Sequence, residues 1–132
     1  MMCTQDPRLS LAAELVSRNA DLSSLWLYGS RARGDHAQTS DYDFAVTFAQ
    51  WAASPLAAVT RVEALRSALA EALDAEVSVV ELDRAPTPLA ASIASEGRLL
   101  LDRAPVETGW LCQRIWSKWD DWCFHRDLQS AP

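Results

Sequence analysis

A glycine–serine turn, followed after ten intervening residues by two aspartates with one residue between them, constrains this chain more than any other feature. Gly29 and Ser30 come directly after an apolar run at residues 25–28, and Asp41 and Asp43 begin a second apolar run. Residues two apart on a strand point to the same side, so we expect the two carboxylates to project together and the apolar residues to face the other way. Two aligned acids beside a turn with free backbone amides are typical of a site for Mg²⁺ and a nucleoside triphosphate.

Each residue type in this pattern suits one part of nucleotidyl transfer, which requires a bound triphosphate, neutralised charge and an aligned nucleophile. Gly29 has no Cβ, so its backbone can approach a phosphate closely. Ser30, at the start of a helical turn, offers its hydroxyl and free backbone N–H groups. Asp41 and Asp43 provide the hard oxygen ligands that Mg²⁺ takes together with substrate phosphates.

Two arginines, Arg31 and Arg33, lie inside the same motif. Arginine suits planar, bidentate contacts with oxyanions, so both are candidates for binding the phosphates or the leaving pyrophosphate. The alternative is that both side chains lie in a solvated loop.

Length and composition predict one globular domain, because 132 residues with 49% apolar content can bury a sizeable core. The formal net charge of −6 argues against a nucleic-acid partner held mainly through phosphate contacts. Cys3, Cys112 and Cys123 form an odd set with no CxxC pair, which favours reduced thiols in the cytoplasm. The N-terminus has no signal-peptide pattern, and no apolar run approaches the ~18 residues of a membrane span. We therefore expect a cytoplasmic protein without a membrane contact.

Hydrophobic periodicity predicts an α/β (α+β) domain in which a mixed sheet of three to four strands is flanked by helices. Strands are expected at residues 25–28, 41–48, 76–82 and 98–101. Helices are expected at residues 8–20, 55–73 and 89–97, with a short helical turn within 30–40. Ser54 and Pro55 suit the N-cap and first turn of the helix at 55–73.

The segment from Pro105 onward changes character and predicts one long C-terminal helix. It contains four of the six tryptophans, Trp110, Trp116, Trp119 and Trp122. Helical spacing predicts a single stripe of Cys112, Ile115, Trp116, Trp119, Trp122 and Cys123. Packing on the domain, docking of a helical partner and self-association all stay open for this stripe, because aromatic residues fill cores and anchor interfaces. We expect residues 1–104 to form the main domain and residues 105–132 a Trp-rich helical tail of the same domain.

The Gly-Ser turn, Gly34 and the Asp-x-Asp pair together resemble the signature of the polymerase-β-like nucleotidyltransferases. More closely, residues 8–103 resemble the minimal nucleotidyltransferase (MNT) proteins of prokaryotes. Those proteins carry a similar strand, proline-opened helix and glycine–arginine return where this chain has VVELDRAPTPLAASIASEGRLLLDR. The resemblance implies a small polymerase-β-type nucleotidyltransferase fold with a mixed sheet and a long C-terminal helix.

The same resemblance implies roles for the motif. Asp41 and Asp43 would bind Mg²⁺, Ser30 would join them in catalysis, and Gly29 and Ser30 would hold the phosphates of ATP. Many MNT proteins are antitoxins of HEPN-domain ribonuclease toxins, and members of that group transfer AMP from ATP to a tyrosine of the toxin. The toxin's own R-x4-H-x-Y pattern is absent here. The resemblance therefore implies the antitoxin of a hetero-oligomeric pair, with the Trp-rich tail as a candidate contact to the HEPN toxin.

One position departs from the family's pattern. The resemblance places Ser78 where the superfamily commonly has a third carboxylate, which helps to bind the catalytic metal and to activate the attacking hydroxyl. Serine is a poor Mg²⁺ ligand and a poor general base. Glu76 lies two residues earlier on the same strand face and is the candidate substitute ligand; the alternative is a solvated residue at the start of the strand.

Three functions follow from these observations. The leading hypothesis is an antitoxin that transfers AMP from ATP, with Mg²⁺, to a tyrosine hydroxyl of a HEPN toxin. The first alternative is the same fold without activity, which neutralises the toxin by binding and occlusion. The second is a small-molecule nucleotidyltransferase that modifies an antibiotic, an activity that usually requires an additional helical domain.

Overall fold

The computed structural model describes residues 6–130, with side chains described up to Asp127. The strands are β1 (Leu22–Tyr28), β2 (Tyr42–Phe48), β3 (Val77–Glu81) and β4 (Arg98–Asp102). The α-helices are α1 (Pro7–Ser17), α2 (Ser30–Arg33), α3 (Pro55–Leu73), α4 (Thr87–Glu96) and α5 (Pro105–Ser130), and a 3₁₀ turn η1 covers Leu82–Arg84. All the helices and strands predicted from the sequence are present.

The four strands form one mixed sheet in the order β3-β2-β1-β4. β1 pairs antiparallel with β2 on one side and with β4 on the other, whereas β2 and β3 are parallel. The connection through α2 joins the antiparallel pair, and the longer α3 provides the crossover that a parallel pair requires. The predicted fold class, a mixed sheet flanked by helices with a long C-terminal helix, is confirmed.

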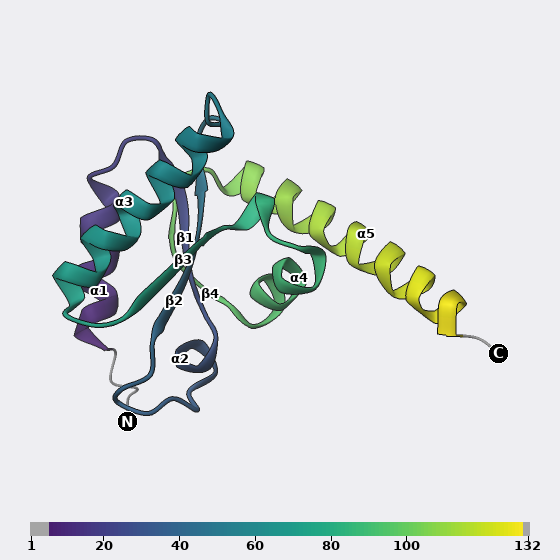
Figure 1. The fold of residues 1–132 in the computed structure, drawn as a ribbon, viewed down its shortest axis with the longest axis horizontal. Coiled ribbons are helices and arrows are strands. Elements are labelled where there is room, and N and C mark those ends of the chain that lie inside the picture. Colours follow the sequence, from purple (N-terminus) through teal and green to yellow (C-terminus); the bar gives the residue numbers. More distant parts are fainter. Residues whose placement is uncertain (1–5, 131–132) are drawn as a thin grey trace.

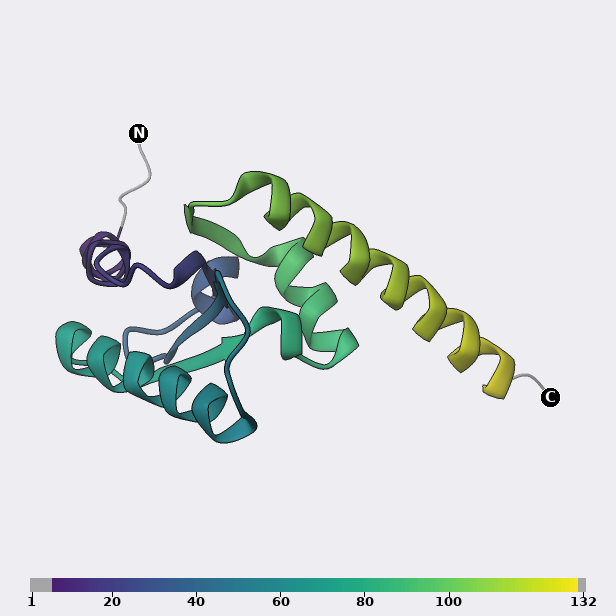
Figure 2. The ribbon, with the colours of Figure 1, turned by 90° about the horizontal axis from the view of Figure 1, so that it is seen from above.

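Helices cover both faces of this sheet, as Figures 1 and 2 show. α1 and α3 pack on one face, where Phe44, Val46 and Leu69 belong to the larger buried core. α4 and the first half of α5 pack on the other face, against Trp26 and Ala45. Alternation along β2 therefore sends Phe44 and Val46 to one core and Ala45 to the other, as the sequence pattern predicted.

Local chemistry explains where the helices begin. The Ser54 hydroxyl accepts a hydrogen bond from the backbone amide of Ala57 at 3.0 Å, and Pro55 occupies the first turn of α3. Asp6 caps α1 in the same way, accepting from the backbone amide of Arg8. The bounds of α3 agree with the predicted helix at 55–73, because both its cap and its stripe are encoded locally.

The predicted start of the first strand at residue 25 is wrong, since β1 begins at Leu22. Two serines precede residue 25 and are typical of a loop, yet Ser24 is completely buried. Its hydroxyl is 2.6 Å from the Thr47 hydroxyl on β2 and accepts from the Trp26 indole at 3.1 Å. These partners satisfy a polar group within the sheet, which makes a serine acceptable at a buried strand position.

Arg61 ties α3 to the end of the sheet where β2 and β3 finish. Its guanidinium donates to the buried Glu81 carboxylate at 3.1 Å and to the backbone oxygen of Gln50 at 2.9 Å. It also lies 3.9 Å from the centre of the Phe48 ring. These contacts hold the parallel crossover against the sheet at its far end from the Gly-Ser turn.

α5 packs on α4 only through its first half and then extends beyond the rest of the domain (Figures 1 and 2). Leu111 and Ile115 are buried, and Cys112 and Trp119 pack at the margin of the same core. Only part of the predicted stripe therefore packs on the domain, because Trp116 and Trp122 remain 40% and 38% exposed. None of the helices between residues 6 and 130 has the length and apolar character of a membrane span. Cys112 and Cys123 are free thiols, whereas Cys3 lies outside the described residues.

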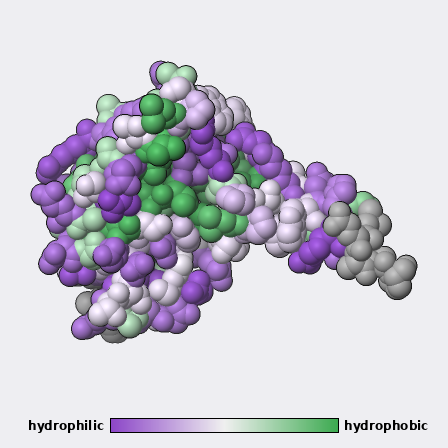
Figure 3. Space-filling model, viewed as in Figure 1, coloured by the Kyte–Doolittle hydropathy of each residue, from purple (hydrophilic) through white to green (hydrophobic). Residues whose placement is uncertain are grey.

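A hydrophobic stripe crosses the face of the molecule seen in Figure 3. It follows a groove between α3 and α4 along the outer strand β3, lined among others by Val59, Val62, Val79 and Leu89. Leu56, at the first turn of α3, is 75% exposed. α3 therefore presents a buried face to the core and an apolar but exposed edge to solvent.

Leu69→Ala is expected to lower the free energy of unfolding by about 3 kcal/mol, because Leu69 is fully buried between α3 and the sheet. Leu56→Ala on the same helix is the matched control and is expected to change it by less than about 0.5 kcal/mol. Urea denaturation followed by circular dichroism measures both values. Equal losses for the two variants would contradict this assignment of the core.

Candidate active site

The predicted site is built on three neighbouring strands at one end of the sheet. Tyr28 at the end of β1 pairs with Asp43 on β2, and Asp43 pairs with Ser78 on β3. Tyr28 packs beside the core on the α4 face, and alternation along β2 and β3 places Asp43 and Ser78 on that same face. The carboxylate of Asp43 therefore lies between two hydroxyl-bearing neighbours.

Gly29 makes the position of Asp43 possible. A Cβ built on Gly29 would lie 2.3 Å from the Asp43 Oδ2 atom, so any larger residue would collide with the carboxylate. Gly29 also has φ = 76° and ψ = −157°, a backbone conformation that favours glycine. The sequence predicted that Gly29 admits a phosphate; the structure shows that it admits the carboxylate of Asp43.

α2 is a single helical turn that begins directly beside this carboxylate. The carbonyl of Gly29 accepts from the amides of Ala32 and Arg33, each at 3.1 Å, and the Ser30 carbonyl accepts from the amide of Gly34 at 2.9 Å. The amides of Ser30 and Arg31 belong to the first turn and have no acceptor within the helix. The predicted helical turn after Gly29 is confirmed, and its amide end lies next to Asp43.

The two aspartates and Arg33 act on one another electrostatically. Burial raises the pKa of Asp43 above its ordinary value, the negative charge of Asp41 raises it further, and the positive charge of Arg33 lowers it. Asp41 is exposed and lies just before β2, whereas Asp43 is half-buried within the strand. Arg33 is also exposed and pairs with Asp35 at 3.2 Å. The structure thus brings Asp41, Asp43 and Arg33 together beside the Gly-Ser turn.

This donor set fits Mg²⁺. Two like charges close together in a partly buried position repel each other, and a divalent cation would remove that repulsion. Mg²⁺ commonly uses one or two protein carboxylates and completes its shell with water and substrate phosphates. Within residues 6–130, no group of three or more histidine, cysteine or acidic side chains lies close enough to hold a metal ion. Asp41 and Asp43 are therefore the two carboxylates that the described site offers.

Glu76 does not join them, so the geometry gives no support to its predicted role as a substitute ligand. It precedes β3, is exposed and lies near Arg66 on α3, whose pKa is raised mainly by the hydrogen bond from Arg66 to Glu63 and to a smaller extent by the charge of Glu76. Near the site, the backbone carbonyl of Glu76 accepts a hydrogen bond from the amide of Tyr42 at 3.0 Å. Alternation along the strand suggested a shared face with Ser78, but Glu76 lies before the ordered strand begins.

Ser78 stands opposite Asp43 on the neighbouring strand, and its side chain lies close enough to Tyr28 to affect the pKa of that phenol. Burial raises the pKa of Tyr28, the charge of Asp43 raises it further, and the neighbouring Ser78 side chain lowers it. Sequence reasoning missed Tyr28 as a neighbour of the site. The available signal was its position immediately before Gly29, which makes it the last side chain of the strand.

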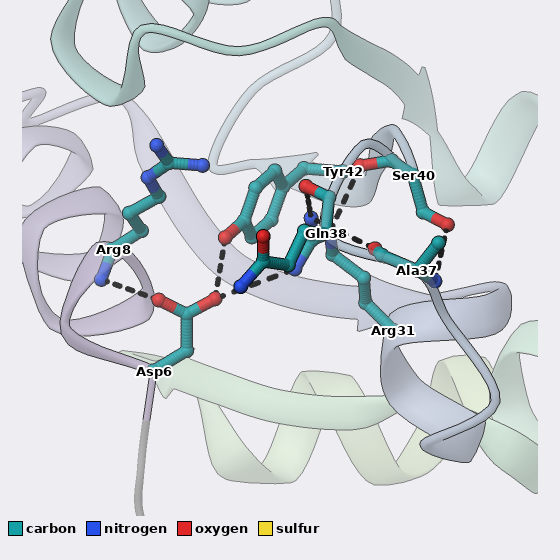
Figure 4. A network of polar contacts seen from close by, with 7 residues as sticks. All are labelled: Asp6, Arg8, Arg31, Ala37, Gln38, Ser40 and Tyr42. Atoms are coloured by element: carbon teal, nitrogen blue, oxygen red, sulfur yellow. Dashed lines mark hydrogen bonds and ion pairs between the residues drawn. The ribbon is translucent and has the colours of Figure 1, made fainter.

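The Arg31 side chain contacts the loop that leads to β2 (Figure 4). Its side chain is only 7% exposed, and its guanidinium donates to the carbonyls of Ser40 at 3.0 Å and Gln38 at 2.9 Å. It lies 3.9 Å from the centre of the Tyr42 ring. These contacts hold the loop, and they give no support to the predicted contact between Arg31 and a phosphate.

The mixed sheet, the Gly-Ser turn and the two aspartates have the arrangement expected of a nucleotidyltransferase. The chain belongs to the polymerase β nucleotidyltransferase family, because the family model described as "Polymerase beta, Nucleotidyltransferase" matches residues 12–105. It is similar to the protein adenylyltransferase MntA of Shewanella oneidensis, with 37% identity over 79 residues. That match covers 60% of this chain and 53% of the relative, so this chain spans about half the length of the relative it matches.

Solved structures agree with this membership. The fold is similar to a chain in a crystal structure of a toxin–antitoxin with AMP-PNP, with a TM-score of 0.75 and 25% identity over 91% of this chain and 93% of the other. A second similar chain comes from a structure of a tri-AMPylated Shewanella oneidensis HEPN toxin in complex with an MNT antitoxin. Its TM-score is 0.67 at 22% identity, over 91% of this chain and 93% of that one, and this likeness shows the fold alone.

Gly29→Ala is expected to weaken binding of ATP with Mg²⁺ at least 10-fold, because the added methyl group would displace the Asp43 carboxylate. Gly34→Ala is the matched control, since Gly34 has φ = 83° but no atom within 4 Å of a built Cβ. Backbone strain should cost Gly34→Ala about 1–2 kcal/mol of folding free energy, because Gly34 is in the left-handed region, and Gly29→Ala about 1–3 kcal/mol, because Gly29 adopts a conformation essentially restricted to glycine. Isothermal titration calorimetry separates them, and an equal loss of ATP affinity would contradict the role given to Gly29.

The raised pKa of Asp43 predicts a pH-dependent stability. The folded state holds the Asp43 proton more tightly than the unfolded state, so ionisation lowers the free energy of unfolding as the pH rises from the ordinary value of 3.8 through the raised value. Asp43→Asn is therefore expected to raise the melting temperature at pH 7 and to give little gain below the ordinary value. Thermal unfolding at several pH values measures this difference.

A second variant tests whether the charge of Asp41 contributes to the raised pKa of Asp43. Asp41→Asn removes the negative charge beside Asp43 and is expected to lower the pKa of Asp43, which carboxyl-detected NMR titration reports directly. An Asp43→Asn variant less stable than the wild type at pH 7, or an unchanged Asp43 titration in Asp41→Asn, would contradict the electrostatic account.

Proposed function

We propose that this chain is an Mg²⁺-dependent nucleotidyltransferase that transfers AMP from ATP to a tyrosine hydroxyl of a HEPN-type partner toxin, and thereby acts as its antitoxin. The observation that carries the proposal is the placement of Asp41 and Asp43 beside the amide end of α2, with Gly29 making room for the inner carboxylate. The similarity to an adenylyltransferase and to toxin–antitoxin chains supports this choice of donor and partner.

The chain's own residues supply the binding functions of such a transfer. The first-turn amides of α2 and the Ser30 hydroxyl would hold the phosphates of ATP, and Arg33 would add positive charge beside them. Asp41 and Asp43 would hold Mg²⁺, which neutralises charge on the reacting and leaving phosphates when it is bound. The tyrosine oxygen of the partner would form a bond to the α-phosphorus as the bond to pyrophosphate breaks, and the hydroxyl proton would be released.

The presence of Ser78 opposite Asp43, in place of a carboxylate, supports a second candidate function, in which the chain neutralises a toxin by binding alone. A carboxylate opposite Asp43 could accept the proton of the attacking hydroxyl, but the strand partners of Asp43 are the hydroxyl-bearing residues Tyr28 and Ser78. Neither hydroxyl is a base near neutral pH. The chain could therefore bind Mg²⁺ and ATP yet transfer AMP slowly or not at all, and neutralise a toxin by occlusion.

The Trp-rich tail is the surface that we propose for the partner. Residues 105–132 would form a tail of the domain made by residues 1–104, with α5 extending past α4 (Figure 2). Trp110 is 63% exposed, and Trp116 and Trp122 are partly exposed further along. Trp119 stacks on Trp122 with ring centres 5.2 Å apart, which stiffens an aromatic surface. Exposed tryptophans are frequent anchors of protein interfaces, which supports the docking of a partner toxin in a hetero-oligomer.

The decisive experiment is incubation of the purified chain with ATP, Mg²⁺ and the product of the neighbouring gene, followed by intact mass measurement. The proposal expects the partner to gain one or more AMP units. Asp41→Ala and Asp43→Ala are expected to abolish this gain, whereas Glu14→Ala, which removes an exposed carboxylate on α1, is expected to leave it unchanged. Tight complex formation without any mass gain would overturn the enzymatic proposal in favour of occlusion.

Ser78→Asp distinguishes a slow enzyme from an inactive one. If the absent third carboxylate limits the reaction, this variant is expected to transfer AMP at least 10-fold faster than the wild type. Ser78→Asn is the matched control, because it adds a side chain of similar size without a negative charge or a base. An equal effect of both variants would show that the charge at this position does not limit the reaction.

A further inference from the structure

Arg31 organises the loop that carries Asp41. Its Nε atom donates to the Ser40 carbonyl at 3.0 Å, and its Nη2 atom donates to the carbonyls of Gln38 at 2.9 Å and Ala37 at 3.5 Å (Figure 4). One guanidinium thus contacts three carbonyls within four consecutive residues. The Ser40 hydroxyl closes the same turn by accepting from the amide of Ala37 at 2.9 Å.

The Arg31 guanidinium also contacts Tyr42 and Asp6, which lie outside this loop. It lies 3.9 Å from the centre of the Tyr42 ring, and its Nη1 atom is 3.6 Å from the Oδ2 atom of Asp6. The Tyr42 hydroxyl donates to the same Asp6 carboxylate, which also caps α1 through the amide of Arg8. Arg31 is therefore fixed between the start of α1 and the first residue of β2, and it has little freedom to reorient.

Asp41 lies between two residues that Arg31 contacts. Ser40, which precedes it, is bound through its carbonyl, and Tyr42, which follows it, lies under the guanidinium. Asp41 itself is exposed and precedes the paired residues of β2, so neither burial nor sheet pairing fixes it. Asp43 differs, because strand pairing on both sides and contact with Gly29 determine its position.

We propose that Arg31 is a positioning residue for Asp41: through the carbonyls of Ala37, Gln38 and Ser40 and the ring of Tyr42, it holds that carboxylate where it can share a cation with Asp43. This inference rests on the part of the proposed function in which the two aspartates bind ATP together with Mg²⁺, and it does not depend on AMP transfer. It gives Arg31 an indirect role, whereas Arg33 remains the arginine available to the phosphates.

The test compares Arg31→Lys with Arg18→Lys. Lysine keeps the charge but lacks the planar fork that reaches several carbonyls at once, and Arg18 is the matched control because it forms an exposed pair with Glu14 on α1. Calorimetric titration of ATP, with excess Mg²⁺ and again with EDTA, gives the readout. Arg31→Lys is expected to weaken Mg²⁺-dependent ATP binding about 10-fold or more and to leave binding in EDTA unchanged, because supporting residues of metal sites commonly have effects of this size.

A double-mutant cycle identifies the residue through which Arg31 acts. In an Asp41→Asn background, Arg31→Lys is expected to cause no further loss of ATP affinity, whereas in an Asp43→Asn background it is expected to cause a further loss. A loss that persists in the Asp41→Asn background, or that also occurs in EDTA, would show a direct phosphate contact and overturn the proposal. An Arg31→Lys variant with wild-type affinity would overturn it as well.

Hydrogen exchange separates this inference from the proposed function. Without nucleotide, Arg31→Lys is expected to increase amide exchange in residues 37–41 and to leave the paired residues Phe44–Val46 protected. Unchanged exchange in the loop would overturn the positioning role even if the wild type failed to bind ATP. Conversely, wild-type protein that binds Mg²⁺ and ATP but transfers no AMP would contradict the proposed transfer and leave the role of Arg31 intact.

Discussion

The contact between the Asp43 carboxylate and Gly29 is the constraint on which the rest of the site depends. Asp43 belongs to the central pair of strands, so its backbone is fixed by hydrogen bonding on both sides. Its side chain can occupy its position only because Gly29 has no Cβ and turns the chain sharply at the end of β1. The same turn starts α2, and one glycine thereby places a carboxylate and a set of free amides side by side.

This arrangement of two neighbouring carboxylates suits a binding site but lowers the free energy of unfolding. Burial and the charge of Asp41 both oppose ionisation of Asp43, so the ionised carboxylate lowers the stability of the fold, and a bound cation would relieve this repulsion. Two arginines stabilise the surrounding structure, one at each end of the sheet. Arg61 holds α3 to the far end of the sheet, and Arg31 holds the loop before β2, each arginine combining a ring contact with hydrogen bonds to backbone oxygens.

The sequence predicted those features that local chemistry determines. The bounds of α3 follow from Ser54 and Pro55 and from a regular apolar stripe, and the shared face of Asp43 and its strand neighbours follows from alternation. The early start of β1 could not be predicted, because Ser24 is buried only through hydrogen bonds to Trp26 and to the distant Thr47.

The candidate site shows the same division between local and tertiary information. Spacing identified Asp41 and Asp43, but only the register of three strands reveals that Tyr28 and Ser78 flank the inner carboxylate. The orientation of the Arg31 side chain could not be predicted either, since it depends on Asp6 at the start of α1, which is distant along the chain. Residues whose roles depend on such distant partners require the folded structure.

The central claim is that the Gly-Ser turn and the two aspartates form one site for a divalent cation with a nucleotide. Paramagnetic broadening by Mn²⁺ tests it most directly, with ¹⁵N-labelled protein and AMP-PNP, because the effect marks the amides nearest the ion. The account predicts selective broadening of the amides of Gly29, Ser30, Asp41 and Asp43. Broadening centred on Glu81 at the opposite end of the sheet, or spread evenly over the surface, would contradict it.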